Sequence, residues 1–328
     1  MDEVSPAQKV QDLIHGHVTA RCLHVVARFG VADALGDEPE SPHSLAEKTG
    51  LHPDALHRML RLLAAQGIFA QEADGFVHTE ASQVLRGDHP LSLRNYACLI
   101  GSQINWESFG QLAEVARAGH PVGGGFEARM KRLAQHPEEA ELFNAAMRGK
   151  AARVVPAVVE AVDFDRFGRV CDVGGGSGHL IRAIVERTRS TTGILFEVPH
   201  VIAAAKDIAG PRLELAAGDF FTGDLPAADC YVLMDVLHDW NDEDARRIVT
   251  NIRRAAMPGA SLFVIETMVS DRPGQYYGKI LDVSMLVLTG GRERSAAELE
   301  TVLEGTGFRL IREIETPARY SIAQAEAI

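Results

Sequence analysis

Short apolar runs alternate with segments of helical periodicity from residue 168 onward. A continuous apolar run between turn signals is typical of a buried strand. Alternation of such runs with helices predicts a parallel sheet covered by helices on both faces, which is an α/β fold. The runs are RVCDVG (169–174), GILFEV (193–198), LELAAGD (213–219), CYVLMDVL (230–237) and SLFVIET (261–267).

Two further strand-like runs, FRLIREIE (308–315) and YSIAQAEA (320–327), have only TPAR between them. Parallel neighbours need a crossover of about a dozen residues or more. We therefore expect these runs to form an antiparallel hairpin at the edge of the sheet, which brings the sheet to seven strands.

The first half of the chain has helical periodicity and little strand signal. A long amphipathic pattern covers residues 10–35, and another covers residues 143–162. Between them, residues 41–80 predict a helix, a turn at Gly50, a second helix from Pro53 and two short strands around Asp74-Gly75. This order is typical of a winged helix-turn-helix. With 328 residues we expect two domains, a helical one over residues 1–160 and a sheet domain over residues 161–328.

The charge balance argues against a nucleic-acid partner. The formal net charge is 33 − 45 = −12, and non-specific binding to phosphates needs an excess of cations. The helix from Pro53 carries only Arg58 and Arg61 as cations, while Glu72, Asp74 and Glu80 near the expected wing would repel phosphates. We therefore expect no DNA binding.

Composition also limits the location of the protein. Apolar residues make up 46% and charged residues 24%, as in ordinary soluble proteins, and no apolar run approaches the roughly 18 residues of a membrane span. The first ten residues have neither the cationic start nor the apolar core of a secretory signal. The cysteines (Cys22, Cys98, Cys171, Cys230) are far apart and predict reduced thiols rather than a metal site. We expect a cytoplasmic protein with no bound metal.

A glycine-rich turn follows the first strand of the sheet domain. Its sequence, VCDVGGGSGHL (170–180), holds glycine at 174, 176 and 178, where the backbone can approach a ligand closely. A dinucleotide fingerprint would need a further glycine where His179 stands. A tight structural turn rarely needs four glycines in five positions. The turn therefore predicts a ligand other than a dinucleotide.

Acidic residues end the next two strands. Glu197 can accept hydrogen bonds from ribose hydroxyls, although this feature alone would serve NAD as well. Asp219 can accept from an adenine amino group, and Phe220 or Phe221 can stack on the ring, the other being ordinary core. Together these residues favour an adenosine ligand that lacks a pyrophosphate.

His238 follows the fourth strand, at the edge where open α/β sheets bind their ligands. A histidine after a strand is more often structural. At this edge, however, a neutral imidazole with a pKa of about 6.5 could accept the proton of a phenol with a pKa of about 10. Glu293, just before a helix, could orient the ring, or it could cap that helix or pair with nearby arginines. Asp239 is a second candidate, although sequence neighbours do not readily face the same ring.

Four motifs occur in order along the chain: DVGGGSG, GDFF, VLHDWNDE and GGRERS. In these motifs the chain resembles the small-molecule O-methyltransferases of plants and bacteria, a family that includes caffeate, hydroxyindole and antibiotic-tailoring enzymes. The resemblance covers nearly the whole chain. It implies a class I methyltransferase fold with a Rossmann-like seven-stranded sheet, and an N-terminal all-helical, winged-helix-like domain for dimerisation. It also implies S-adenosylmethionine as cofactor and S-adenosylhomocysteine as product.

The resemblance assigns roles to individual residues. His238 is implied as the general base and Glu293 as the residue that orients it, while Trp240 would pack beneath the loop. Family members often carry another glutamate in the final strand, where this chain has Gln324. The residues implied to contact the cofactor are Gly174, Gly176, Glu197, Gly218, Asp219, Phe220 and Asp235, the last at a position that varies across the family.

The acceptor is expected between the sheet edge and the helical domain. The resemblance implies that the helical domain forms a homodimer and closes the pocket of the partner subunit. Apolar residues at helical spacing are also common in cores, so the pocket candidates have two interpretations. They are Trp106, Asn144, Met147, Asp282, Met285 and Leu286.

We therefore expect an O-methyltransferase that acts on a hydroxyl group of an aromatic small molecule, as in bacterial secondary metabolism and antibiotic biosynthesis. Two alternatives stay open. Some relatives keep the cofactor but catalyse decarboxylation, hydroxylation or pericyclisation, and a ligand-responsive DNA-binding regulator is disfavoured by the charge. The residues do not identify the acceptor, and they do not show whether an oxygen or a nitrogen atom receives the methyl group.

Overall fold

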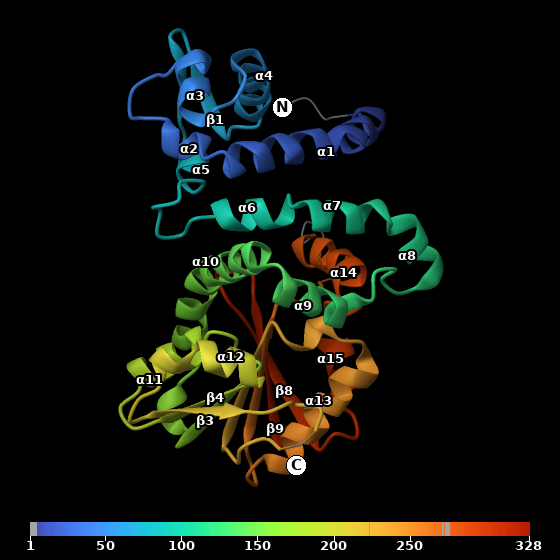
Figure 1. Cartoon of the computed structure of the whole chain (residues 1–328). Helices are drawn as coiled ribbons and strands as arrows, with labels where there is room; N and C mark the ends of the chain where they lie inside the picture. Colours follow the sequence, from blue (N-terminus) through green and yellow to red (C-terminus); the bar gives the residue numbers. More distant parts are fainter. Residues whose placement is uncertain (1–4, 223, 271, 273–275) are drawn as a thin grey trace. The chain divides into compact units, whose positions relative to one another are not determined.

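The computed structural model describes residues 5–222, 224–270, 272 and 276–328 (Figure 1). The chain forms two compact units. One comprises Met1–Phe109 and Leu133–Ala152, and the other Gly110–Arg132 and Arg153–Ile328. This division differs from a single boundary near residue 160, because Gly110–Arg132 clusters with the unit that contains the large sheet.

The second unit is built on a seven-stranded sheet with the strand order β5-β4-β3-β6-β7-β9-β8. Neighbouring strands from β5 to β7 are parallel, while β9 runs antiparallel to both β7 and β8. The predicted α/β fold and the terminal hairpin are thus confirmed. The strands are β3 (Arg169–Val173), β4 (Thr192–Glu197), β5 (Leu213–Ala217), β6 (Cys230–Met234), β7 (Ser261–Glu266), β8 (Phe308–Glu315) and β9 (Ser321–Ala327).

Helices cover both faces of this sheet. In Figure 1, α11 and α12 lie to one side of the strands, and α13 and α15 to the other. The helix α13 is capped by Asn241, whose side chain accepts from Asp244 N–H, and it buries one apolar stripe toward the core. The helices and short 3-10 turns after residue 110 are α8 (Leu112–Ala118), α9 (Gly125–Gln135), α10 (Pro137–Ala161), η1 (Phe164–Arg166), α11 (His179–Arg187), α12 (Pro199–Ala204), η2 (Lys206–Ile208), η3 (Leu237–Asp239), α13 (Asp242–Ala255), α14 (Tyr277–Leu288) and α15 (Ala296–Leu303). Of these, the end of α9 and most of α10 belong to the first unit, which includes Leu133–Ala152.

The fourth strand of the sheet ends earlier than its apolar run predicts. The run continues to Leu237, but β6 stops at Met234 because Asp235 adopts a φ of 57°. Such a positive φ cannot continue a strand. The chain turns instead into η3, so His238 lies on a 3-10 turn at the carboxyl end of β6.

The described residues of the first unit are mainly helical and include the hairpin β1–β2. Its sequence places α3, a left-handed turn at Gly50, α4 and the hairpin β1–β2 in the order predicted for a winged helix. Apolar residues of α1, α3, α4 and both strands form its core. The elements are α1 (Pro6–Arg28), α2 (Val31–Ala34), α3 (Pro42–Thr49), α4 (Pro53–Ala65), β1 (Phe69–Glu72), β2 (Gly75–His78), α5 (Glu80–Gln83), α6 (Arg94–Ile100) and α7 (Gln103–Gly110).

A membrane-spanning helix is not found among the described residues, since none of their helices is both long and apolar enough.

One buried phenol fixes the loop that leads into β6. Tyr231 is fully buried, accepts a hydrogen bond from Ala228 N–H (3.0 Å) and donates to Pro226 O (2.8 Å). Replacing it by phenylalanine removes the hydroxyl and leaves both backbone groups without this partner. We expect Y231F to lower the free energy of unfolding by about 1–3 kcal/mol. Urea unfolding measures this change. The control is Y276F, whose side chain is 68% exposed, and equal midpoints for the two variants would refute the prediction.

Candidate active site

The catalytic candidates meet in one buried pair. His238 Nδ1 lies 2.8 Å from Glu293 Oε1, and the side chains are 8% and 0% exposed. An ionised carboxylate only accepts hydrogen bonds, so Nδ1 carries the proton and Nε2 keeps its lone pair in the neutral ring. Within the described part of the chain, Nε2 has no hydrogen-bond partner. The pair can therefore hold the ring in the tautomer that a general base needs.

Glu293 dominates the electrostatics of this imidazole. Burial disfavours the imidazolium, but the charge of Glu293 and its hydrogen bond outweigh burial and raise the pKa of His238. Asp239 and Asp235 raise this pKa further. Asp239 thus acts on the ring by charge, whereas Glu293 is the carboxylate bonded to Nδ1.

Glu266 is a further acid beside His238, and the sequence analysis did not identify it. It is 3% exposed at the end of β7, and its Oε1 accepts from His238 N–H (3.0 Å). Burial raises the pKa of Glu266 to about 7. Its place directly after the apolar run 262–265 could have identified it, because this strand ends at the ligand-binding edge.

Gln324, by contrast, lies away from the imidazole. It pairs with Phe263 in the β7–β9 register, and its Oε1 accepts from Arg312 Nε (2.9 Å). In this chain, the additional glutamate that contacts His238 is therefore on β7 and not on the final strand.

Asp282 supports Glu293 from α14. Its Oδ1 accepts a hydrogen bond from Glu293 N–H (3.1 Å). Partial burial raises the pKa of Asp282, although this hydrogen bond opposes the shift. Asp282 was expected at the acceptor, and its observed contact is instead to the backbone of the orienting glutamate.

The glycine-rich turn at the end of β3 combines two roles for glycine. Gly174 and Gly176 have φ values of 70° and 56°, in the left-handed region that disfavours other residues. A Cβ at Gly176 would meet no atom within 4 Å, so there is open space at this position. A Cβ at Gly175 would overlap the carboxylate of Asp172, so Gly175 is required for packing.

Glu197 connects this turn to the next strand. Its Oε1 accepts from Gly176 N–H (3.2 Å) and its Oε2 from Val198 N–H (2.7 Å). Burial raises its pKa. A carboxylate has further lone pairs, so Glu197 can also accept from the hydroxyls of a ribose beside the glycines. Gly218, in contrast, fits a packing role, because a Cβ there would overlap the ring of Phe196.

An aromatic cluster lies beyond β5. Phe220 packs against Phe221 (4.9 Å between ring centroids), and both contact Trp240 (5.9 and 4.7 Å). Phe220 Cε1 would lie 3.7 Å from a Cβ at Gly174, so Phe220 faces the glycine turn. Phe221 lies instead beneath the guanidinium of Arg247 (4.7 Å). Phe220 is thus the better placed of the two to stack on an adenine.

Asp219 and Asp235 complete the acidic residues of this edge. Asp219 Oδ1 accepts from Phe221 N–H (2.8 Å) and shapes the turn. Asp235 Oδ1 accepts from the hydroxyl of Tyr320 (2.8 Å), a residue that the sequence did not indicate. The turn, Glu197, Asp219 and Asp235 all follow carboxyl ends of parallel strands, an arrangement that fits a nucleoside without a pyrophosphate.

The remaining acceptor candidates are divided between the two units. Met285 and Leu286 are half-buried on α14 of the sheet unit. Trp106, Asn144 and Met147 belong to the helical unit, where Trp106 is 40% exposed beneath the guanidinium of Arg21 (4.6 Å).

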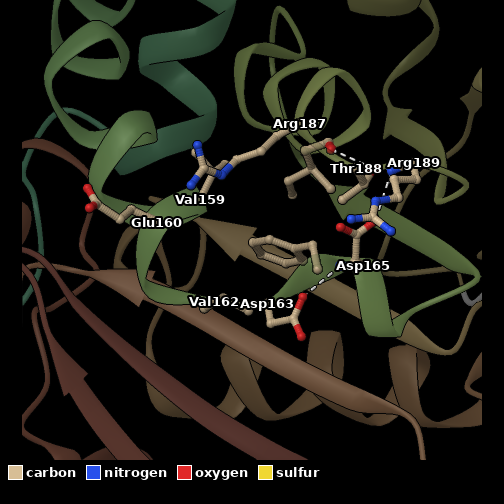
Figure 2. A pocket seen from close by; sticks show the side chains of 10 residues that line it. Val159, Glu160, Val162, Asp163, Asp165, Arg187, Thr188 and Arg189 are labelled. Carbon is tan, nitrogen blue, oxygen red and sulfur yellow. Dashed lines mark hydrogen bonds between the residues drawn. The ribbon is translucent and has the colours of Figure 1, made fainter.

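A cavity of about 520 Å³ occurs elsewhere in the sheet unit (Figure 2). Its walls include Asp163 and Asp165, which precede β3, and Arg187, Thr188 and Arg189 at the end of α11 and just after it. These segments meet the amino ends of the parallel strands. The cavity is therefore at the edge opposite to His238.

Known proteins of one family match this chain. The model of the O-methyltransferase domain matches residues 117–309, and that of the O-methyltransferase dimerisation domain matches residues 11–88. Phenazine O-methyltransferase PhzM of Lysobacter antibioticus is 37% identical, over 96% of this chain and 95% of its own length. The mitomycin biosynthesis 6-O-methyltransferase of Streptomyces lavendulae is 33% identical, over 94% and 90%. A crystal structure of human N-acetylserotonin methyltransferase with S-adenosylmethionine superimposes with a TM-score of 0.89 at 25% identity, over 99% of both chains.

The matched catalytic domain covers more than half of the chain, and the sheet edge carries a turn and acids that fit the adenosine part of the cofactor. The chain therefore belongs to the O-methyltransferase family and is an S-adenosylmethionine-dependent O-methyltransferase.

Proposed function

We propose that this enzyme methylates a hydroxyl group of an aromatic small molecule of bacterial secondary metabolism, with His238 as general base and Glu293 as the residue that orients it. The observation that carries the proposal is the buried contact of 2.8 Å between His238 Nδ1 and Glu293 Oε1 at the carboxyl end of β6. The names of the relatives, a phenazine and a mitomycin O-methyltransferase, support the substrate class.

In this proposal the imidazole moves one proton. Glu293 accepts from Nδ1–H, and Nε2 takes the proton of the acceptor hydroxyl as the oxygen attacks. The bound cofactor supplies an electrophilic methyl group on a sulfonium sulfur. The residues around His238 contribute mainly by geometry, since in-line alignment of the reacting atoms supplies much of the acceleration.

The cofactor is proposed to bind along the carboxyl edge of β3, β4, β5 and β6. Glu197 would accept from the ribose hydroxyls while it holds Gly176 N–H. Asp219 would accept from the adenine amino group beside Phe220. Gly174, Gly176 and Asp235 would line the methionine part.

The acceptor is proposed to contact the thioether and apolar side chains of the candidate residues. Met285 and Leu286 would contact an aromatic ring from α14, because thioethers adapt to irregular surfaces. Trp106, Asn144 and Met147, which belong to the helical unit, stay predictions from the sequence. Asp282 would affect the acceptor indirectly, through the backbone of Glu293.

A homodimer through the N-terminal domain belongs to the same proposal. Val10, Leu13 and Ile14 of α1 are 58%, 73% and 64% exposed, and their spacing places them along one face of the helix. Burial of such apolar surface drives association. The match of residues 11–88 to a dimerisation domain supports this assignment.

Methyl transfer from labelled S-adenosylmethionine tests the function. Incubation with a panel of phenols, hydroxyphenazines and aromatic polyketides should transfer label to at least one acceptor. H238A should lower kcat about 10²–10⁴-fold, the usual contribution of a general base, and leave the Kd for S-adenosylhomocysteine unchanged. Conversion of an acceptor without consumption of cofactor would favour a non-methylating reaction, and full activity of H238A would refute the base.

The pH dependence of kcat/KM for the acceptor tests the pair. A general base must be neutral, and Glu293 raises the pKa of His238, so kcat/KM should rise with pH until it passes that pKa. E293Q removes the charge that favours the imidazolium, so the pKa of His238 should fall and the acidic limb should move to lower pH. The plateau should fall about 10²-fold because the ring loses its orientation. E304Q, an exposed change on the same segment, should keep both limb and plateau.

Binding of S-adenosylhomocysteine tests Glu197 without an acceptor. E197Q keeps the shape of the side chain but loses its charge, and hydrogen bonds to charged groups contribute about 1.5–3 kcal/mol. We expect the Kd from calorimetry to rise about 10–100-fold, the same free energy expressed as affinity. E214Q on β5, an exposed acid paired with Arg169, serves as control. An unchanged Kd in E197Q would refute the assignment.

A further inference from the structure

The turn that carries His238 is short, and its backbone is held by contacts from outside the turn. The guanidinium of Arg294 is 2% exposed and donates from Nη1 to Leu237 O (3.0 Å) and from Nη2 to Trp240 O (2.8 Å). Its Nε donates to Asp242 Oδ1 at the start of α13 (2.9 Å). These contacts lie on both sides of His238 in the chain.

The neighbours of Arg294 hold the backbone of His238 itself. Arg292 N–H donates to His238 O (2.9 Å), and Glu266 accepts from His238 N–H (3.0 Å). A Cβ at Gly291 would overlap His238 O, so this close approach requires glycine. Val269 N–H donates to Arg294 O (3.1 Å), which ties the same segment to the chain that follows β7.

We propose that Arg294 is a positioning residue for methyl transfer: its guanidinium locks the turn of residues 237–240 and so fixes where His238 Nε2 lies. The inference rests on the proposed function of His238. A guanidinium presents planar, rigid donors that can reach two carbonyls and a carboxylate together, whereas a lysine ammonium is a point charge on a flexible stem. Without Arg294, the carbonyls of Leu237 and Trp240 lose the charged donor that joins them, and the turn can move. A displacement of the reacting groups by about 1 Å can cost about 10²-fold in rate.

The charge of Arg294 also acts on Glu266. Burial raises the pKa of Glu266, and the guanidinium opposes this shift by stabilising the carboxylate. The ionised form of Glu266 is the stronger acceptor for His238 N–H. Arg294 therefore supports the backbone of His238 both directly, through carbonyls, and through Glu266.

Arg292 offers a matched control two positions away. Its guanidinium is 44% exposed and pairs with Asp242 Oδ2 (3.4 Å) and Glu298 Oε1 (3.2 Å). Both Arg292 and Arg294 contact Asp242, but the side-chain contacts of Arg292 do not include a carbonyl of the turn of residues 237–240. Alanine at either position removes the same charge from the same segment and lysine keeps it, but only substitution of Arg294 removes the hydrogen bonds to the carbonyls of the turn.

The experiment compares R294K and R294A with R292K and R292A in the full-length enzyme. We expect kcat to fall about 10²-fold in both Arg294 variants, on the acceptor that the wild type methylates, while the Kd for S-adenosylhomocysteine stays within about threefold. Guanidinium ion at millimolar concentration should restore R294A in a saturable manner, because it can fill the space of the lost group. Both Arg292 variants should keep kcat within about threefold and show no response to guanidinium.

Other results overturn the inference. Wild-type kcat in R294K and R294A would show that the turn needs no lock. Equal losses of kcat and cofactor affinity, without rescue, would show a role in stability alone. If R294A does not fold, R294K decides between these outcomes.

The Nδ1 proton signal of His238, in enzyme labelled with ¹⁵N-histidine, gives a readout that needs no acceptor. The signal should shift in R294K and stay unchanged in R292K. An unshifted signal in R294K would refute the proposal. Failure of the proposed function would differ from failure of this inference. In that case the wild type itself would not methylate, or H238A would stay active.

Discussion

The hydrogen bond between His238 and Glu293 joins two ionisable side chains that are buried, where water does not solvate their charges. An isolated charge in such a place is costly, so each partner needs the other, and removal of one typically costs about 3–5 kcal/mol. Within the described residues, Glu293 Oε2 is buried and makes no hydrogen bond, so the carboxylate depends on the imidazole for much of its compensation. The surrounding contacts, from Glu266, Asp282 and Arg294, keep the two side chains facing each other.

This pair also sets the protonation state of His238 before the reaction. Glu293 favours the protonated ring, which is the wrong form for a base. A second cation at the same edge has the opposite effect, because like charges disfavour the imidazolium. A sulfonium charge bound at this edge would favour the neutral ring and so lower the pH at which His238 can act as base, while Glu293 keeps the ring in place.

Much of the sheet follows from local pattern. The apolar runs located each strand, and the short TPAR connection predicted the antiparallel hairpin. The rule that ligands bind at the carboxyl ends of parallel strands also placed Glu197, Asp219 and His238 at one edge, as the structure has them.

Contacts between segments that are distant in the sequence could not be predicted. Glu266 and His238 are 28 positions apart, and Arg294 and Leu237 are 57 apart. The early end of β6 was not predictable either, since Asp235 adopts a positive φ in a run that reads as apolar strand. Asp282, on an amphipathic helix, has the spacing of a pocket residue but caps the backbone of Glu293.

The order of the last strands has a consequence for how the enzyme assembles. β8 precedes β9 in the chain, yet β9 lies inside it, between β7 and β8. Until residues 321–327 insert, β7 is the edge of the parallel part of the sheet, and another chain could join it there. Tyr320, which anchors Asp235 near the base, sits at the start of that inserting strand. The pairing of β9 between β7 and β8 therefore also brings the hydroxyl of Tyr320 to Asp235 at the cofactor edge.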